Sequence, residues 1–262
     1  MNQMTNPDLV SPSLSDGVLT LSLGNGKAHP LSAPMIAALH QAMDAANANP
    51  DARVIVIHGP GHIFCAGHDL KEIARHRTDA DNGRAYLTKL FEDCAAMMQA
   101  ITFSAKPTIA MVDGIATAAG LQLVAACDLA FASEIATFCL PGVINGGFCT
   151  TPGVAVSRAV GRKYLMELLL SGVAKDADWA LRAGLVNEVL PAADLAEHVS
   201  NFARLLATRN PGPIASGKTC TARHLDLSLP EAYAAATDTM IGHFMDPDRI
   251  AYEKSSRWRD TS

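Results

Sequence analysis

Two stretches decide the fold of this chain: Gly59-Pro-Gly-His-Ile-Phe-Cys-Ala-Gly-His-Asp-Leu-Lys-Glu72 and Val112-Asp-Gly-Ile-Ala-Thr-Ala-Ala-Gly-Leu-Gln-Leu-Val-Ala-Ala-Cys-Asp128. An apolar run typical of a buried strand leads into each one: Val54–Ile57 and Pro107–Val112. A helix is predicted after each glycine-containing loop. This succession of strand, loop and helix predicts a layered α/β core rather than a helical bundle.

The glycines of the two loops allow the main chain to approach a ligand closely. Gly67 precedes a predicted helical turn, so the backbone N–H of His68 can point outward at a helix N-terminus, where negative charge is favoured. Ala118-Ala-Gly120 stands at the start of the next helix, where Ala119 can offer a partner N–H. Either loop alone is explained by an ordinary strand-to-helix turn. Both together predict a pair of donors that stabilises an oxyanion.

The composition is that of an ordinary globular protein. The chain has 262 residues, 49% of them hydrophobic, which is enough for one large domain with a substantial core. A net charge of -5 and scattered basic residues argue against nucleic-acid binding. The polar segment Met1–Asp16 predicts a loosely ordered arm, neither signal peptide nor membrane span. Six dispersed cysteines indicate reduced thiols, so a cytoplasmic protein is expected.

Hydrophobic periodicity predicts the remaining elements. Strands are predicted at Val18–Leu23, Leu129–Ala132 and Thr137–Leu140, and helices from Ser32 to Asn47, around Leu87–Ile101, and after Thr151 and Arg162. From Ala192 onward the pattern is almost entirely helical, with predicted helices at Leu195–Leu206, Ile214–Leu225, Pro230–Met245 and Asp248–Trp258. We therefore expect a core of residues 1–191 and a helical region of residues 192–262, with a boundary near Pro191.

The order and spacing of the two loops, with Asp69-Leu-Lys-Glu72 after one and Cys127-Asp128 after the other, resemble the crotonase (enoyl-CoA hydratase/isomerase) superfamily. The resemblance covers nearly the whole chain. It implies a ClpP/crotonase-like spiral of ββα units, a helical C-terminal oligomerisation region, and a homotrimer or dimer of trimers (a hexamer). It also implies an acyl-CoA ligand, a lyase or isomerase of fatty acid metabolism labelled enoyl-CoA hydratase, and no cofactor besides the CoA of the substrate.

The same resemblance implies a set of CoA contacts. The segment Lys27-Ala-His-Pro-Leu31 is similar to the family's Lys-x-Asn-Ala-Leu, which implies Lys27 near the CoA phosphate or ribose. A solvated surface lysine is an equal alternative for Lys27 and Lys71. The resemblance further implies that the Ala66 carbonyl meets the adenine and that small residues such as Gly120 leave room for the thioester. The wall beside the thioester is formed by His68, Asp69, Leu70 and Lys71.

Both glutamates used by the family's hydratases are missing. Their positions hold Gln122, three residues after Ala119, and Gly142, directly after Pro141. Neither residue can transfer a proton as a carboxylate does, and each acid/base group contributes ~10² to 10⁴ in rate. Hydratase activity of the standard type is therefore expected to be very weak or absent, although Gln122 can still hold water or the thioester by hydrogen bonding.

The segment Leu140–Ser157 contains other candidate proton carriers. It is similar to the mitochondrial enoyl-CoA hydratase domain-containing branch and its bacterial relatives. By resemblance to decarboxylases and dehalogenases, a catalytic side chain falls at Cys149 or Thr150. A Cys149 thiolate would be a nucleophile or base if a helix N-terminus lowered its pKa, and a small packed hydrophobe is the alternative. Glu72 is a further candidate, although the helix dipole also explains a carboxylate there.

A second motif is rejected. Gly212-Pro-Ile-Ala-Ser-Gly-Lys-Thr219 matches the phosphate-binding P-loop pattern, but a helical run precedes it and Pro213 removes one N–H donor. We interpret it as a helix start, and no metal site is expected elsewhere.

Three functions remain open: oxyanion chemistry without the glutamates (decarboxylation, isomerisation or thioester hydrolysis), a hydratase with acid/base groups from elsewhere, and a pseudoenzyme that binds acyl-CoA or a protein partner.

Overall fold

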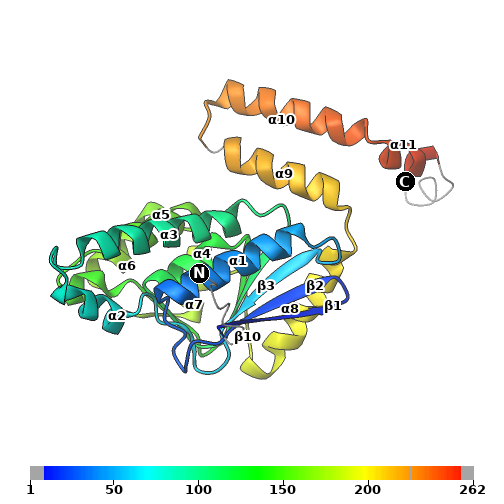
Figure 1. Cartoon of the computed structure of the whole chain (residues 1–262). Helices are drawn as coiled ribbons and strands as arrows, with labels where there is room; N and C mark the ends of the chain where they lie inside the picture. The colour runs from blue at the N-terminus through cyan, green and yellow to red at the C-terminus, as the bar shows by residue number, and fades with distance from the viewer. Residues whose placement is uncertain (1–8, 225, 255–262) are drawn as a thin grey trace, which may run out of the picture. The chain divides into compact units, whose positions relative to one another are not determined.

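A computed structural model describes residues 9–224 and 226–254 of the protein (Figure 1). Contacts divide the chain into two compact units, one ending at Thr208 and one starting at Arg209. The first unit contains every strand that the described residues form, and it carries both of the loops that decide the fold.

The larger of two sheets has six strands. β1 and β2 are antiparallel, and the pairs from β2 to β10 are parallel. In spatial order its strands are β1 (Val10–Ser15), β2 (Val18–Leu23), β3 (Val54–His58), β5 (Thr108–Val112), β7 (Leu129–Ser133) and β10 (Glu188–Leu190). The predicted strands at 18–23, 54–57, 107–112 and 129–132 are therefore confirmed.

The smaller sheet has four strands, with β9 antiparallel to β8: β4 (Ile63–Cys65), β6 (Ile115–Thr117), β8 (Thr137–Cys139) and β9 (Lys175–Asp176). Successive strand pairs divide between the sheets, since β3, β5 and β7 join the larger one while β4, β6 and β8 join the smaller one. Helical segments follow each pair. This repetition is the spiral of ββα units that the family resemblance implied, and it brings the loops after β4 and β6 to neighbouring positions.

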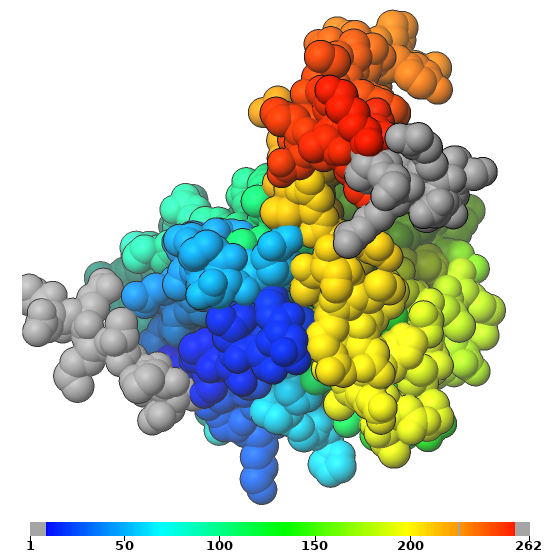
Figure 2. Space-filling model, turned by 90° about the vertical axis from the view of Figure 1, so that its right-hand side faces the viewer, coloured from blue at the N-terminus to red at the C-terminus, as the bar shows by residue number. Residues whose placement is uncertain are grey.

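Helices cover the larger sheet on both faces (Figure 1). Alternation along β3 explains why: Ile55 and Ile57 belong to one hydrophobic cluster, whereas Val54 and Val56 belong to another. The first cluster includes α1 (Ala33–Ala48), α3 (Arg84–Thr102), α4 (Ala119–Ala126) and α7 (Ala177–Ala183). The second includes α8 (Ala192–Ala207), whose atoms lie beside those of β1 and β2 in Figure 2.

The ends of these helices follow from local chemistry. Ser32 caps α1, since its Oγ accepts a hydrogen bond from the N–H of Met35 at 3.3 Å, and Pro34 stands in the first turn. Gly83, with φ at +81°, immediately precedes α3. Three shorter helices complete the unit: α2 (Leu70–Arg75), α5 (Thr150–Ala159) and α6 (Arg162–Ser171), with 3₁₀ turns η1 (His76–Thr78) and η2 (Pro141–Asn145).

The N-terminal segment differs from its prediction. Residues 10–15 form strand β1 rather than a loosely ordered arm, and residues 1–8 lie outside the described part of the chain. Asp16 and Gly17 have φ of 51° and 78°, as the turn of a two-residue hairpin requires, so the Asp-Gly pair held the missing signal. The strand is polar because it lies at the edge of the sheet, where most of its side chains are exposed.

The second unit is helical: α9 (Pro211–His224), α10 (Leu229–Phe244) and α11 (Pro247–Lys254). Leu225 and Trp258, the predicted ends of two helices, lie outside the described residues. The whole of Gly212–Thr219 is inside α9, so the rejection of a P-loop is confirmed. Helix α8 packs on the larger sheet through Leu195, Val199 and Ala203, and the first compact unit therefore extends beyond Pro191 to Thr208.

Candidate functional site

The first loop turns at Gly67, between β4 and α2. Leu31 donates its N–H to the Gly67 carbonyl at 2.8 Å and accepts the N–H of Asp69 at 3.3 Å. These bonds use the groups on either side of His68, so the N–H of His68 itself points away from Leu31. Within residues 9–224 and 226–254, that N–H has no acceptor.

The second loop turns at Ala118, between β6 and α4. Ala118 has φ of 52° and ψ of −120°, a conformation that is strained for a residue with a side chain. Its N–H donates to the Cys139 carbonyl at 2.9 Å, which ties the turn to the end of β8. Ala119 is the first residue of α4, where a helix leaves its N–H unsatisfied.

The two loops touch each other. A Cβ placed on Gly67 would lie 2.8 Å from the Cβ of Ala118 and 3.0 Å from the N of Ala119, and the φ of Gly67 is +83°. A Cβ on Gly120 would lie 2.0 Å from the carbonyl oxygen of Cys65. Only glycine fits at both positions. The free N–H groups of His68 and Ala119 thus lie on neighbouring loops, one of them at a helix N-terminus, in an arrangement that suits an anionic oxygen.

Gln122 lies one turn into α4 on the same side as Ala119. It is only 5% exposed, and among the described residues its Oε1 has no hydrogen-bond partner. A buried amide oxygen without a partner is costly, so a donor from a ligand or water is expected there. The amide can accept or donate a hydrogen bond, but it cannot carry a proton as a glutamate does.

Gly142 lies in η2 and is covered by Cys149, the residue before α5. The N–H of Gly142 donates to the Sγ of Cys149 at 3.3 Å. A Cβ on Gly142 would lie 2.6 Å from the backbone N of Cys149, so the backbone at 148–149 occupies the space that a side chain would need. Burial raises the pKa of the Cys149 thiol above its usual value, against a smaller lowering by the bond from Gly142.

The ring of His68 packs edge-on against Phe91 of α3, with centroids 5.2 Å apart and planes at 89°. Burial lowers the pKa of His68 to about 4, so the imidazole is neutral near pH 7. Its Nε2 is buried and has no hydrogen-bond partner within the described residues. The sequence predicted a role for the backbone N–H of His68, and the structure adds the buried environment of its side chain.

The residues expected near CoA lie on and around the first loop. Ala66 donates its N–H to the carbonyl of Ala28 at 2.9 Å, which joins the loop to the segment that contains Lys27. Asp69 caps α2, because its Oδ1 accepts the N–H groups of Lys71 at 2.9 Å and Glu72 at 3.1 Å. Exposed side chains of this group are those of Lys27, Leu70 and Lys71.

The carboxylate of Glu72 contacts the first helix of the chain. Its Oε2 accepts the N–H of Ala33, the first residue of α1, at 2.9 Å. Burial, with the carboxylate of Glu72 next in importance, raises the pKa of Tyr86 to about 12. The carboxylate therefore stabilises the junction of α1, α2 and α3, which weakens its candidacy as a proton carrier.

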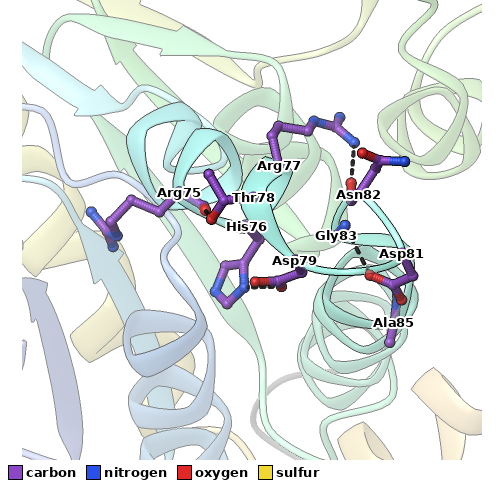
Figure 3. A network of polar contacts seen from close by, with 9 residues as sticks. All are labelled: Arg75, His76, Arg77, Thr78, Asp79, Asp81, Asn82, Gly83 and Ala85. Atoms are coloured by element: carbon purple, nitrogen blue, oxygen red, sulfur yellow. Dashed lines mark hydrogen bonds and ion pairs between the residues drawn. The ribbon is translucent and has the colours of Figure 1, made fainter.

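The connection between α2 and α3 is braced by polar contacts that the sequence did not single out (Figure 3). Asp81 accepts the N–H groups of Gly83 at 3.0 Å and Ala85 at 2.8 Å, and so caps α3. The Nδ1 of His76 lies 2.7 Å from the Oδ2 of Asp79. The spacing of Asp81 and Gly83 before a long apolar helix was the available signal for this cap.

No group of three or more His, Cys, Asp or Glu residues that could hold a metal ion is found in residues 9–224 and 226–254. None of the helices in the described part of the chain is long and apolar enough to cross a membrane.

Known proteins are similar to this chain in both sequence and fold. The rat enoyl-CoA hydratase domain-containing protein 3 is 38% identical over 90% of this chain and 78% of its own length. The crystal structure of an enoyl-CoA hydratase/isomerase family protein from Silicibacter pomeroyi is 58% identical, with a TM-score of 0.86 over 90% of this chain and all of that one. An enoyl-CoA hydratase from Mycobacterium smegmatis is 40% identical, with a TM-score of 0.87 over 92% and 93%.

The relatives correct one prediction. The rat, mouse and human relatives, each 38% identical to this chain, are named as mitochondrial proteins. This finding overturns the cytoplasmic location expected from the sequence and points to mitochondria instead. The expectation failed because dispersed, reduced thiols are equally compatible with other reducing compartments.

A family-wide comparison agrees with these individual relatives. The sequence profile of the enoyl-CoA hydratase/isomerase family matches residues 14–257, which includes both loops and most of the helical second unit. The solved structures add that the α/β spiral described above is the crotonase fold. On these grounds the chain belongs to the enoyl-CoA hydratase/isomerase family of the crotonase superfamily.

Proposed function

We propose that the protein binds an acyl-CoA and stabilises negative charge on its thioester oxygen with the backbone N–H groups of His68 and Ala119. One observation carries this proposal: the loops at Gly67 and Ala118 touch, and each presents an N–H that has no acceptor among the residues that the structure describes. Preorganised donors of this kind stabilise an enolate or a tetrahedral oxyanion, and each contributes ~10² to 10³ in rate.

The reaction differs from standard hydration in this proposal. Gln122 and Gly142 stand where two glutamates are needed, and the backbone of Cys149 fills the space beside Gly142. We therefore expect enolate or oxyanion chemistry on a thioester, such as decarboxylation, isomerisation or thioester hydrolysis, rather than efficient addition of water. The Gln122 Oε1, buried and unpartnered among the described residues, supports a hydrogen bond to the ligand or to a bound water.

The remaining features of the proposal concern the rest of the ligand and the assembly. Lys27 and Ala66 would contact the CoA, and no further cofactor is invoked. The protein would form a homotrimer or a dimer of trimers. This assembly is supported by the second unit, where α9, α10 and α11 have no buried residues and several large apolar side chains are exposed: Leu229, Tyr233, Met240, Ile241 and Phe244.

Calorimetric titration with acetyl-CoA, crotonyl-CoA and methylmalonyl-CoA, followed by mass spectrometry of each ester, tests the proposal. Binding with a changed mass would establish an enzyme and name its reaction class. Binding of the esters without any change would favour a protein that only binds acyl-CoA. If none of the three binds, while free CoA also fails to bind, the oxyanion site proposed here is wrong.

A further inference from the structure

The imidazole of His68 is unexplained by a role that needs only the backbone of this residue. Its Nε2 is buried without a partner among the described residues. Most buried polar atoms in folded proteins have a hydrogen-bond partner, and an exception calls for an explanation such as a missing ligand. The nearest described ring, Phe91, offers an aromatic edge contact but no hydrogen-bonding group.

Covalent geometry limits how far the ring can lie from the proposed thioester. The same residue carries the backbone N–H that would face the oxyanion, so its ring nitrogens lie no farther from the thioester oxygen than one hydrogen bond and one side chain together. The contact with Phe91 at 5.2 Å holds the ring toward α3. The carbon next to the thioester carbonyl is two bonds from that oxygen and therefore lies in the same region of the site.

The protonation state of the ring suits a base. Burial lowers the pKa of His68 to about 4, and no charged neighbour contributes to the shift. A neutral imidazole with its proton on Nδ1 has a lone pair on Nε2. Its basicity is then close to that of an ordinary glutamate, whose pKa is about 4.3. Glutamate is the residue that is absent at Gln122 and Gly142.

The other candidates are engaged elsewhere. Glu72 accepts the N–H of Ala33 at 2.9 Å, at the start of α1. Cys149 has a raised pKa, so its thiol keeps its proton near pH 7 and accepts the Gly142 N–H through sulfur. The side-chain amide of Gln122 neither gains nor loses a proton near pH 7.

We propose that the His68 side chain is a catalytic base that removes a proton from the carbon next to the thioester carbonyl; this inference rests on the proposed function. The Nε2 lone pair takes the proton, the C–H electron pair forms the C=C bond of an enolate, and the carbonyl π electrons move to oxygen. The N–H groups of His68 and Ala119 stabilise that oxygen. The imidazolium then returns a proton to the same carbon, or to another carbon of an unsaturated chain, so no oxidant or co-reactant is required.

Exchange of acetyl-CoA hydrogens with solvent deuterium tests this step directly. Wild-type protein in deuterium oxide should raise the mass of the acetyl group, measured by mass spectrometry against acetyl-CoA alone. His68→Ala and His68→Gln keep the backbone N–H, so both should bind acetyl-CoA within about twofold of wild type while exchange falls ~10²-fold or more. Added imidazole should restore part of the exchange in His68→Ala. His62→Ala, at an exposed histidine just before β4, is the matched control.

The outcomes separate the two proposals. Wild-type binding without exchange, or full exchange in His68→Ala and His68→Gln, would overturn the base while the acyl-CoA site stands. Absence of any binding by wild type would overturn both. Circular dichroism of His68→Gln, which keeps a similar volume and a polar end, checks that lost exchange is not lost folding.

Discussion

The backbone half of the candidate site and its side-chain half are built by different means. The two N–H groups depend on backbone geometry at Gly67 and Ala118, where loops with positive φ touch. The side-chain half consists of Gln122 and His68, together with Gly142 at a position where the family's hydratases have a glutamate. The fold thus constrains where an acyl-CoA would bind far more tightly than what would happen to it. Site geometry and reaction must therefore be argued separately for a protein of this family.

The largest expected effect tests the backbone half. Gly67→Ala places a Cβ 2.8 Å from the Cβ of Ala118 and 3.0 Å from the N of Ala119, so the two loops must separate. We expect hydrogen exchange to fall by ~10² or more, because removal of one oxyanion donor lowers the catalytic rate by that factor, and we expect acetyl-CoA to bind more weakly. Calorimetry and exchange measure both losses.

Gly61→Ala is the control for Gly67→Ala. Gly61 also has positive φ, at +95°, but a Cβ there has no neighbour within 4 Å. Gly61→Ala therefore introduces the backbone strain of a non-glycine residue but no clash between the Gly67 and Ala118 loops. It should bind acetyl-CoA like wild type. Equal losses in both variants would show that loop contact is not what positions the donors.

A second prediction uses pH to test the side-chain half. Burial holds the pKa of His68 at about 4, below its unfolded value near 6.5, and burial also lowers the pKa of His58. Because the unfolded chain binds more protons in this interval, stability is full above pH 6.5 and falls as the pH drops toward 4. For His68 the loss amounts to at most about 3 kcal/mol.

Urea unfolding at pH 7 and pH 4.5 measures this loss. His68→Gln removes the ionisable group, so its stability should fall less between the two pH values than that of wild type. His62→Ala should retain the full wild-type difference. An unchanged pH dependence in His68→Gln would mean that the imidazole is not buried in its neutral form, which would also remove the basis for its role as a base.

A third prediction concerns restoration of the glutamates. Gln122→Glu replaces a buried amide with a carboxyl group of similar size. It should confer at most weak hydration of crotonyl-CoA, because Gly142, at the second glutamate position, still offers no proton carrier. Gly142→Glu places its Cβ 2.6 Å from the backbone N of Cys149, so we expect a loss of about 1 to 3 kcal/mol in stability. Hydration is followed by disappearance of crotonyl-CoA and stability by urea unfolding. Efficient hydration by the double variant at wild-type stability would show that η2 adapts readily.

These contrasts also explain what the sequence could reveal. The apolar run of β3 and the glycines of the two loops are local signals that predicted a layered α/β core and two strand-to-helix loops, whereas the spiral that brings these loops together was implied by the family resemblance. The edge strand β1 was not predicted, because most of its side chains are exposed and it lacks the apolar run of a strand that is buried on both faces. The neutral state of His68 was not predictable, since it depends on burial against Phe91, a residue of a separate helix.

The smallest effect is expected for Cys149→Ser. Burial raises the pKa of the thiol, so the group is protonated near pH 7 and its described contact is acceptance of the Gly142 N–H, which a serine oxygen can also make. We expect hydrogen exchange within about twofold of wild type and a change in stability of about 1 kcal/mol or less. Cys220→Ser, in the second unit, is the control for loss of any one thiol. A tenfold loss of exchange in Cys149→Ser alone would give the side-chain half a second reactive group, and the division of labour between His68 and the backbone would then have to include sulfur.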